Sequence, residues 1–145
     1  MPSNISPIVS EVTNFKALQE FVMENEGSLV ELTKRYYITL GNDLGFKCEV
    51  PFKTEINGCG IELDIAWFDE SNLEVAFEFE FGTIDEMLAG IAKLTLVNPE
   101  IAVLITSSKA RIASLDKIAS IIKSLAPYGE NFLIIDLAEE RYSIL

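Results

Sequence analysis

The hydrophobic positions in the first third of the chain repeat with the helical period of about 3.6 residues. They predict a short helix between Val12 and Glu24 and a longer helix that begins after Ser28 and ends at Gly41. Ser28 stands three residues before Glu31, which is the capping-box spacing that satisfies free N–H groups at a helix start. Residues 1–11 contain two prolines, and we expect them to form an irregular N-terminal arm.

From Phe46 onward the period changes to two, which is typical of strands with one buried face. Three strands are predicted, over Phe46–Lys53, Ile61–Phe68 and Leu73–Phe81. Short turns at Asn57–Gly60 and Asp69–Asn72 separate them. Consecutive strands joined by short turns indicate an antiparallel meander.

The second half of the chain alternates between helical and strand patterns. The predicted elements are a helix over 83–97, a strand over 101–106, a helix over 108–126, a strand over 132–137 and a short edge element over 142–145. The continuous apolar run of the first of these strands favours burial on both faces. We find no repeat and no linker, so residues 1–145 are predicted to be one α/β domain with a mixed sheet flanked by helices.

The charge balance narrows the choice of partners. Eleven Lys and Arg against 23 Asp and Glu give a formal net charge of −12. This argues against broad electrostatic binding to nucleic acid, which depends on Lys and Arg replacing counterions. A local basic patch for DNA, a bridging Mg²⁺ or a basic protein partner stays open. The chain has no histidine, which excludes Ser-His-Asp and Cys-His triads and His-ligated zinc.

The remaining composition indicates a soluble cytoplasmic protein without membrane contact. The longest apolar runs are far shorter than the ~20 residues that span a bilayer, and the N-terminus lacks a secretory pattern. Cys48 and Cys59 are expected to be buried or half-buried thiols, and a disulfide stays open if they fall on paired strands. The mean hydropathy of +0.27 is high for a small monomer, so we consider a homodimer plausible.

Three acidic residues of the predicted meander are candidates for a metal site. Glu78 and Glu80 lie two positions apart on the third strand and therefore share a face, and Asp64 lies on the polar face of the second. Converging carboxylates repel one another unless they bind a cation or their pKa values rise. Oxygen ligands suit Mg²⁺, Mn²⁺ or Ca²⁺. The alternative is an ordinary acidic face on a half-exposed sheet.

These motifs and this order of elements resemble the PD-(D/E)XK nuclease superfamily, which has a restriction-endonuclease-like αβββαβ core. The motif corresponds here to Leu63-Asp64 and to Glu78-Phe79-Glu80. Leucine replaces the motif proline, and Glu80 stands in the position of the motif lysine. The resemblance covers most of the chain, roughly residues 27 to 107.

The start of the second predicted helix adds to the resemblance. The segment Gly27–Glu31, followed by a helix and then Leu44–Phe46, is similar to the start of archaeal Holliday-junction resolvases. In those enzymes a helix glutamate adds to the metal site, so the resemblance implies that role for Glu31. Its alternative role is that of a capping-box residue.

The resemblance also implies a mechanism. Asp64, Glu78 and the Phe79 carbonyl would hold Mg²⁺ or Mn²⁺, which activates water and stabilises charge on a DNA phosphate. Glu80 would be a second metal ligand or a general base. Lys93, on the next helix, could replace the motif lysine, as displaced lysines do in some relatives, and Lys53 is a weaker substitute. The alternative for Lys93 is a solvated helix residue.

Two functions follow as hypotheses. The first is a metal-dependent endonuclease that hydrolyses DNA phosphodiester bonds. The second is a catalytically inactive nuclease-fold domain that serves as a protein-interaction or assembly module, which the missing motif lysine and the acidic surface favour. A purely structural α/β subunit, with no phosphate or metal site, is the third alternative.

Overall fold

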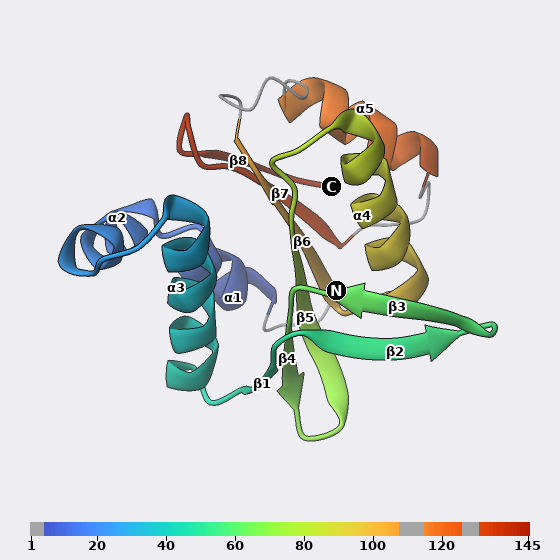
Figure 1. Ribbon diagram of the computed structural model, residues 1–145, viewed down its shortest axis with the longest axis horizontal. Coiled ribbons are helices and arrows are strands. Elements are labelled where there is room, and N and C mark those ends of the chain that lie inside the picture. Colours follow the sequence, from blue (N-terminus) through green and yellow to red (C-terminus); the bar gives the residue numbers. More distant parts are fainter. Residues whose placement is uncertain (1–4, 108–114, 126–130) are drawn as a thin grey trace.

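The computed structural model describes residues 5–107, 115–125 and 131–145 (Figure 1). The helices are α1 (Ile5–Val12), α2 (Phe15–Glu24), α3 (Leu29–Asp43), α4 (Ile84–Val97) and α5 (Leu115–Leu125). The strands are β1 (Lys47–Glu49), β2 (Phe52–Ile56), β3 (Cys59–Leu63), β4 (Ile65–Asp69), β5 (Asn72–Phe79), β6 (Ile101–Thr106), β7 (Phe132–Asp136) and β8 (Arg141–Ile144). In this part of the chain, the main sheet has six strands in the order β1-β4-β5-β6-β7-β8, and β2 and β3 form a separate hairpin.

The main sheet lies between two layers of helices. In Figure 1, α1, α2 and α3 cover one face and α4 and α5 cover the other. The sheet is mixed, because β5, β6 and β7 are parallel while β1, β4 and β8 pair antiparallel with their neighbours. The predicted α/β class, with a mixed sheet flanked by helices, is therefore confirmed.

Each face of the sheet has its own hydrophobic core. Toward α1–α3, the strand residues Phe77, Val103 and Ile135 pack with Tyr37 of α3. Toward α4 and α5, another set that includes Leu104 packs with the inner residues of these helices. All residues of β6 and β7 are buried, as the continuous apolar run of the sequence predicted for β6.

The N-terminal prediction was wrong. Residues 5–11 do not form an irregular arm but belong to α1, and Ile8, Val9 and Val12 are buried in the core against the sheet. Pro7 lies in the first turn of this helix, where the missing N–H group has no intrahelical acceptor to lose. Pro7 therefore does not prevent the helix, and burial of its apolar face stabilises it; residues 1–4, which include Pro2, lie outside the described residues.

Two predicted strands are each divided. The segment Phe46–Lys53 contains β1 and the start of β2, which are separated near Pro51, and proline cannot donate to a ladder. The segment Ile61–Phe68 is divided at Asp64 into β3 and β4. The antiparallel pairing of β4 with β5 is as predicted, whereas β2 and β3 leave the main sheet as a hairpin that extends past α4 (Figure 1).

The remaining predictions concern the helix over 108–126, the cysteines and membrane contact. The predicted helix over 108–126 includes α5, and residues 108–114 and 126 lie outside the described residues. Cys48, on β1, is half-buried as expected, whereas the same expectation was wrong for Cys59, which is exposed on β3; both are free. No helix in the described ranges is long and apolar enough to cross a membrane.

Candidate active site

The candidate site forms where the β4–β5 ladder ends. The last paired residues on that side are Ile65 and Phe77. Beyond them, carboxylates replace backbone carbonyls as acceptors: the Asp64 N–H donates to Glu78 Oε1 at 2.9 Å, and the Phe79 N–H donates to Asp64 Oδ2 at 2.8 Å. The Glu78 side chain is therefore fixed by the backbone of Asp64, and the Asp64 side chain by the backbone of Phe79, the residue after Glu78.

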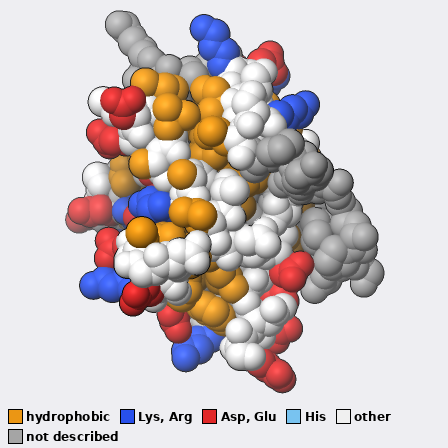
Figure 2. All heavy atoms as spheres, turned by 90° about the vertical axis from the view of Figure 1, so that its right-hand side faces the viewer, with side chains coloured by type: hydrophobic (Ala, Val, Ile, Leu, Met, Phe, Trp, Pro, Cys, Tyr) orange, Lys and Arg blue, Asp and Glu red, His pale blue; other side chains and the backbone are white. Residues whose placement is uncertain are grey.

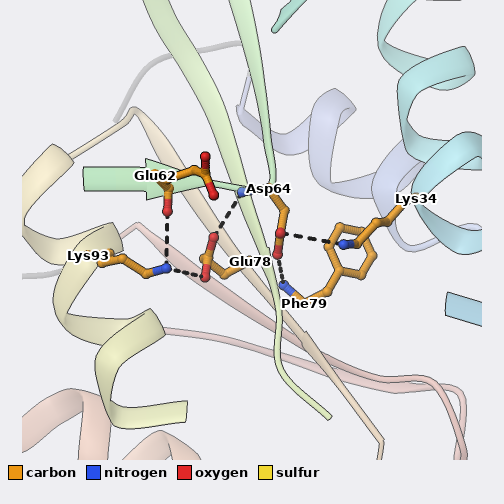
Figure 3. Close-up of polar contacts among 6 residues, drawn as sticks. All are labelled: Lys34, Glu62, Asp64, Glu78, Phe79 and Lys93. Carbon is orange, nitrogen blue, oxygen red and sulfur yellow. Dashed lines mark hydrogen bonds and ion pairs between the residues drawn. The ribbon is translucent and has the colours of Figure 1, made fainter. Parts of the chain in front are cut away.

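A lysine from each helical layer approaches these carboxylates. Lys93 of α4 lies 3.1 Å from Glu78 Oε2 and donates to the Glu62 carbonyl at 3.0 Å. Lys34 of α3 lies 3.5 Å from Asp64 Oδ1, and its Nζ is 5.5 Å from the centre of the Phe79 ring. Figure 3 shows the two lysines on opposite sides of the acidic pair.

Burial differs strongly among the acidic residues. The side chain of Glu78 is 3% exposed and that of Asp64 30% exposed, whereas Glu80 is half-buried. Glu80 lies under α4 at Gly90, where an added Cβ would be 2.7 Å from Glu80 Oε1. The glycine thus lets the helix lie directly against this carboxylate.

The pKa values of Glu78 and Glu80 reflect the crowding of negative charge at the site. Burial raises the pKa of Glu78 above its ordinary value, and the neighbouring charge of Asp64 raises it further, while Lys93 opposes both effects. Burial, together with the hydrogen bond to Glu78 and its charge, raises the pKa of Glu80 to about 8. The pair formed by Glu78 and Glu80 therefore retains a proton at neutral pH.

The donor set suits a hard divalent cation in its chemistry. Asp64, Glu78 and Glu80 offer only oxygen atoms, and the raised pKa values show negative charge that a cation would relieve. The oxygens of Asp64 and Glu78 already accept from lysine or backbone donors. Accordingly, the described residues hold no ready-made cluster of three metal-ligating side chains, and a cation would have to displace the lysines.

Two other residues singled out in the sequence lie outside this group. Glu31 is exposed in the first turn of α3, where its N–H donates to Ser28 Oγ at 3.2 Å, so its observed contact is that of a helix start. Lys53 is 76% exposed on the β2–β3 hairpin and pairs with Glu62 at 3.8 Å. Neither contacts Asp64 or Glu78 through any interaction recorded for the described residues.

Lys34 was not among the site residues predicted from the sequence. It is three positions after Glu31 and therefore lies on the same face of α3, one turn further along. That spacing was the signal available in the sequence, because a helix that directs Glu31 toward a site also directs Lys34 toward it. In the structure it is Lys34 that reaches Asp64.

Comparison with known proteins adds no assignment: no protein-family model, curated protein or solved structure matches this chain.

Proposed function

We propose that this chain is a metal-dependent phosphodiesterase that cleaves DNA, built like the PD-(D/E)XK nucleases. The observation that carries the proposal is the position of Lys93. The lysine of the motif is replaced by Glu80, yet an ammonium group from α4 lies 3.1 Å from Glu78 Oε2. The chain thus brings two motif acids and one lysine together, although the lysine comes from another element.

The residues have separate roles in this proposal. Asp64 and Glu78, with the Phe79 carbonyl, would hold Mg²⁺ or Mn²⁺, and such an ion would supply an activated water and stabilise charge on a phosphate. Glu80, which would release its proton when the cation binds, would be a further ligand or, once ionised, a general base. Before a cation binds, Lys93 balances the buried charge of Glu78 and orients its carboxylate.

Substrate binding must overcome the net charge of −12. Lys34 and Lys93 form a local cationic flank on both sides of the acidic pair, where they would contact phosphates adjacent to the scissile one (Figure 3). A bound divalent cation adds positive charge at the same place. DNA binding is therefore expected to depend on the cation more strongly than in a basic nuclease.

A second candidate function is that of a nuclease-fold domain that has lost cleavage and binds a protein. It is favoured by the protein donors that already occupy the oxygens of Asp64 and Glu78. Figure 2 shows hydrophobic side chains along one face, with acidic and some basic side chains along their margins. α4 also exposes Ile84 and Leu96. A basic partner would suit the acidic margins, and a second copy of the chain would suit the hydrophobic side chains.

A cleavage assay separates the two candidates. Supercoiled, single-stranded and branched DNA would be incubated with the protein and Mg²⁺ or Mn²⁺, and nicking would be followed on gels. We expect metal-dependent nicking by the wild type and at least a hundredfold loss in Asp64→Asn and Glu78→Gln, about 3 kcal/mol of transition-state stabilisation. These isosteric variants keep an acceptor for each backbone N–H group.

The matched control is Glu74→Gln. Glu74 is also a buried acid of β5 and lies on the same face as Glu78, but its recorded partner is Asn72. The control should cleave like the wild type. If the wild type produces no nicking above background on any DNA, the enzyme proposal is wrong and the binding module is favoured.

A further inference from the structure

A buried hydroxyl extends the candidate site across the sheet. Parallel pairing continues from β5 through β6 to β7, with Phe79 opposite Ile105 and Thr106 opposite Asp136. Glu80 follows Phe79, and its N–H donates to the Ile105 carbonyl at 2.8 Å. Glu80, Thr106 and Asp136 therefore form a row at the carboxyl ends of three parallel strands, where open α/β sheets bind ligands.

All three members of the row face α4 and α5. Side chains alternate along a strand, and Ala76, Leu104 and Ile134 belong to the core on that side of the sheet. Glu80, Thr106 and Asp136 lie an even number of positions further along the same strands. Lys93 of α4, which contacts Glu78 on β5, lies on this side too.

Thr106 is the member of this row for which the described residues offer no partner. It is 3% exposed, and its Oγ1 has no hydrogen-bond partner in the part of the chain that the structure describes. By contrast, Asp136 Oδ1 accepts from the N–H groups of Ala138 and Glu139 and so stabilises the turn after β7. An unpaired buried hydroxyl destabilises a fold, so a valine of the same shape would be the better choice unless the hydroxyl binds something.

We propose that the Thr106 hydroxyl is a further binding group of the acidic site, and that it hydrogen-bonds the water shell of a divalent cation held beside Glu80. A hydroxyl both donates and accepts, so it can bond a water without adding charge to a site that already holds three carboxylates. The inference deepens the proposed function and rests on it. It makes Thr106 a positioning residue and assigns it no step of the chemistry.

Calorimetric titration with Mn²⁺, together with thermal unfolding of the metal-free protein, tests this inference. We expect Thr106→Val to weaken Mn²⁺ binding about fivefold, the usual effect of one hydrogen bond, while the metal-free variant unfolds at a higher temperature than the wild type. Thr106→Ser keeps the hydroxyl and should bind Mn²⁺ within about twofold of the wild type.

Two controls make the outcomes distinct. Thr33→Val changes an equally buried threonine whose hydroxyl donates to the Leu29 carbonyl at 2.6 Å, and it should leave Mn²⁺ binding unchanged. Glu78→Gln should abolish binding. If Glu78→Gln abolishes binding while Thr106→Val binds like the wild type, the role of Thr106 is refuted and the metal site stands. If the wild type binds no Mn²⁺, both proposals are refuted.

Discussion

The ionisation of Glu80 decides the charge of the candidate site. Lys34 and Lys93 balance two of the three carboxylates, and the third, Glu80, has a pKa raised to about 8 by burial and by Glu78. At neutral pH the group is therefore close to electrically neutral. A divalent cation would replace this proton as well as the lysine contacts, so metal binding is coupled to proton release.

The raised pKa of Glu80 predicts that the folded protein becomes less stable as the pH rises. In the unfolded chain, Glu80 has an ordinary pKa of ~4.3. Between about pH 4.5 and pH 8, the folded state therefore binds a proton that the unfolded state has lost. The free energy of unfolding should therefore fall as pH rises through this window and should level off above it. In Glu80→Gln, which mimics the protonated acid, this fall should be smaller. Urea unfolding at several pH values measures it.

Glu74→Gln is again the matched control, because it removes one acid from the same face of β5. It should retain the pH slope of the wild type. Equal slopes for the wild type and Glu80→Gln would show that Glu80 does not retain its proton in the folded protein.

At the scale of elements, the division between β3 and β4 builds the site. Asp64 accepts the Phe79 N–H through its side chain, and its own N–H donates to Glu78. These bonds end the β4–β5 ladder. On the other side of Asp64, β3 lies near α4, and the Glu62 carbonyl of β3 accepts from Lys93. The acids are thus part of the sheet as well as candidates for chemistry.

The hydrogen bond from the Phe79 N–H to Asp64 predicts that two substitutions of Asp64 differ in their free energy of unfolding. Asp64→Ala leaves the buried Phe79 N–H without its acceptor and should lower the free energy of unfolding by about 1–3 kcal/mol. Asp64→Asn keeps an oxygen acceptor and should cost clearly less. Asp69→Ala, at an exposed position of β4, should change stability by no more than about 0.5 kcal/mol. Equal losses for the Ala and Asn variants would contradict the assigned hydrogen bond.

The sequence predicted the elements whose patterns are regular and missed those decided by tertiary contacts. The alternation before Glu80 identified β5, and the apolar run identified β6. The residues of α1 were predicted to be irregular because of Pro2 and Pro7, since burial of Ile8 and Val9 against the sheet is visible only in the fold. The division at Asp64 depends on hydrogen bonds to another strand, which a single-strand pattern does not contain.

The same distinction holds for the site. Strand periodicity predicted a shared face for Asp64 and Glu78, whereas Asp64 lies in the break between β3 and β4 and contacts Glu78 through its backbone N–H. Lys93 contacts Glu78, and its role as a replacement for the motif lysine stays a prediction. Lys34 was missed because its contact with Asp64 depends on how α3 packs across the sheet. Thr106 was missed because the pairing of β6 with β5 is a property of the sheet order.

At the scale of the whole molecule, the net charge of −12 opposes compaction. The Lys53–Glu62 and Arg141–Glu139 ion pairs are largely exposed and contribute little to stability. Screening them with salt therefore lowers the stability only slightly. Raising NaCl from about 10 mM to 300 mM shortens the Debye length several-fold and should therefore raise the unfolding temperature. KCl should give the same rise in calorimetry. A fall with salt would show that attractive ion pairs outweigh the net repulsion.

The central claim is that Asp64, Glu78 and Glu80 share one divalent cation, and anomalous X-ray scattering tests it most directly. Crystals of the full chain soaked in MnCl₂ would be measured at a wavelength where manganese scatters anomalously. The account predicts a manganese peak within bonding distance of Asp64 and Glu78, with Lys93 displaced from Glu78 Oε2. Manganese bound only elsewhere on the acidic surface, with the Lys93–Glu78 pair intact, would contradict it.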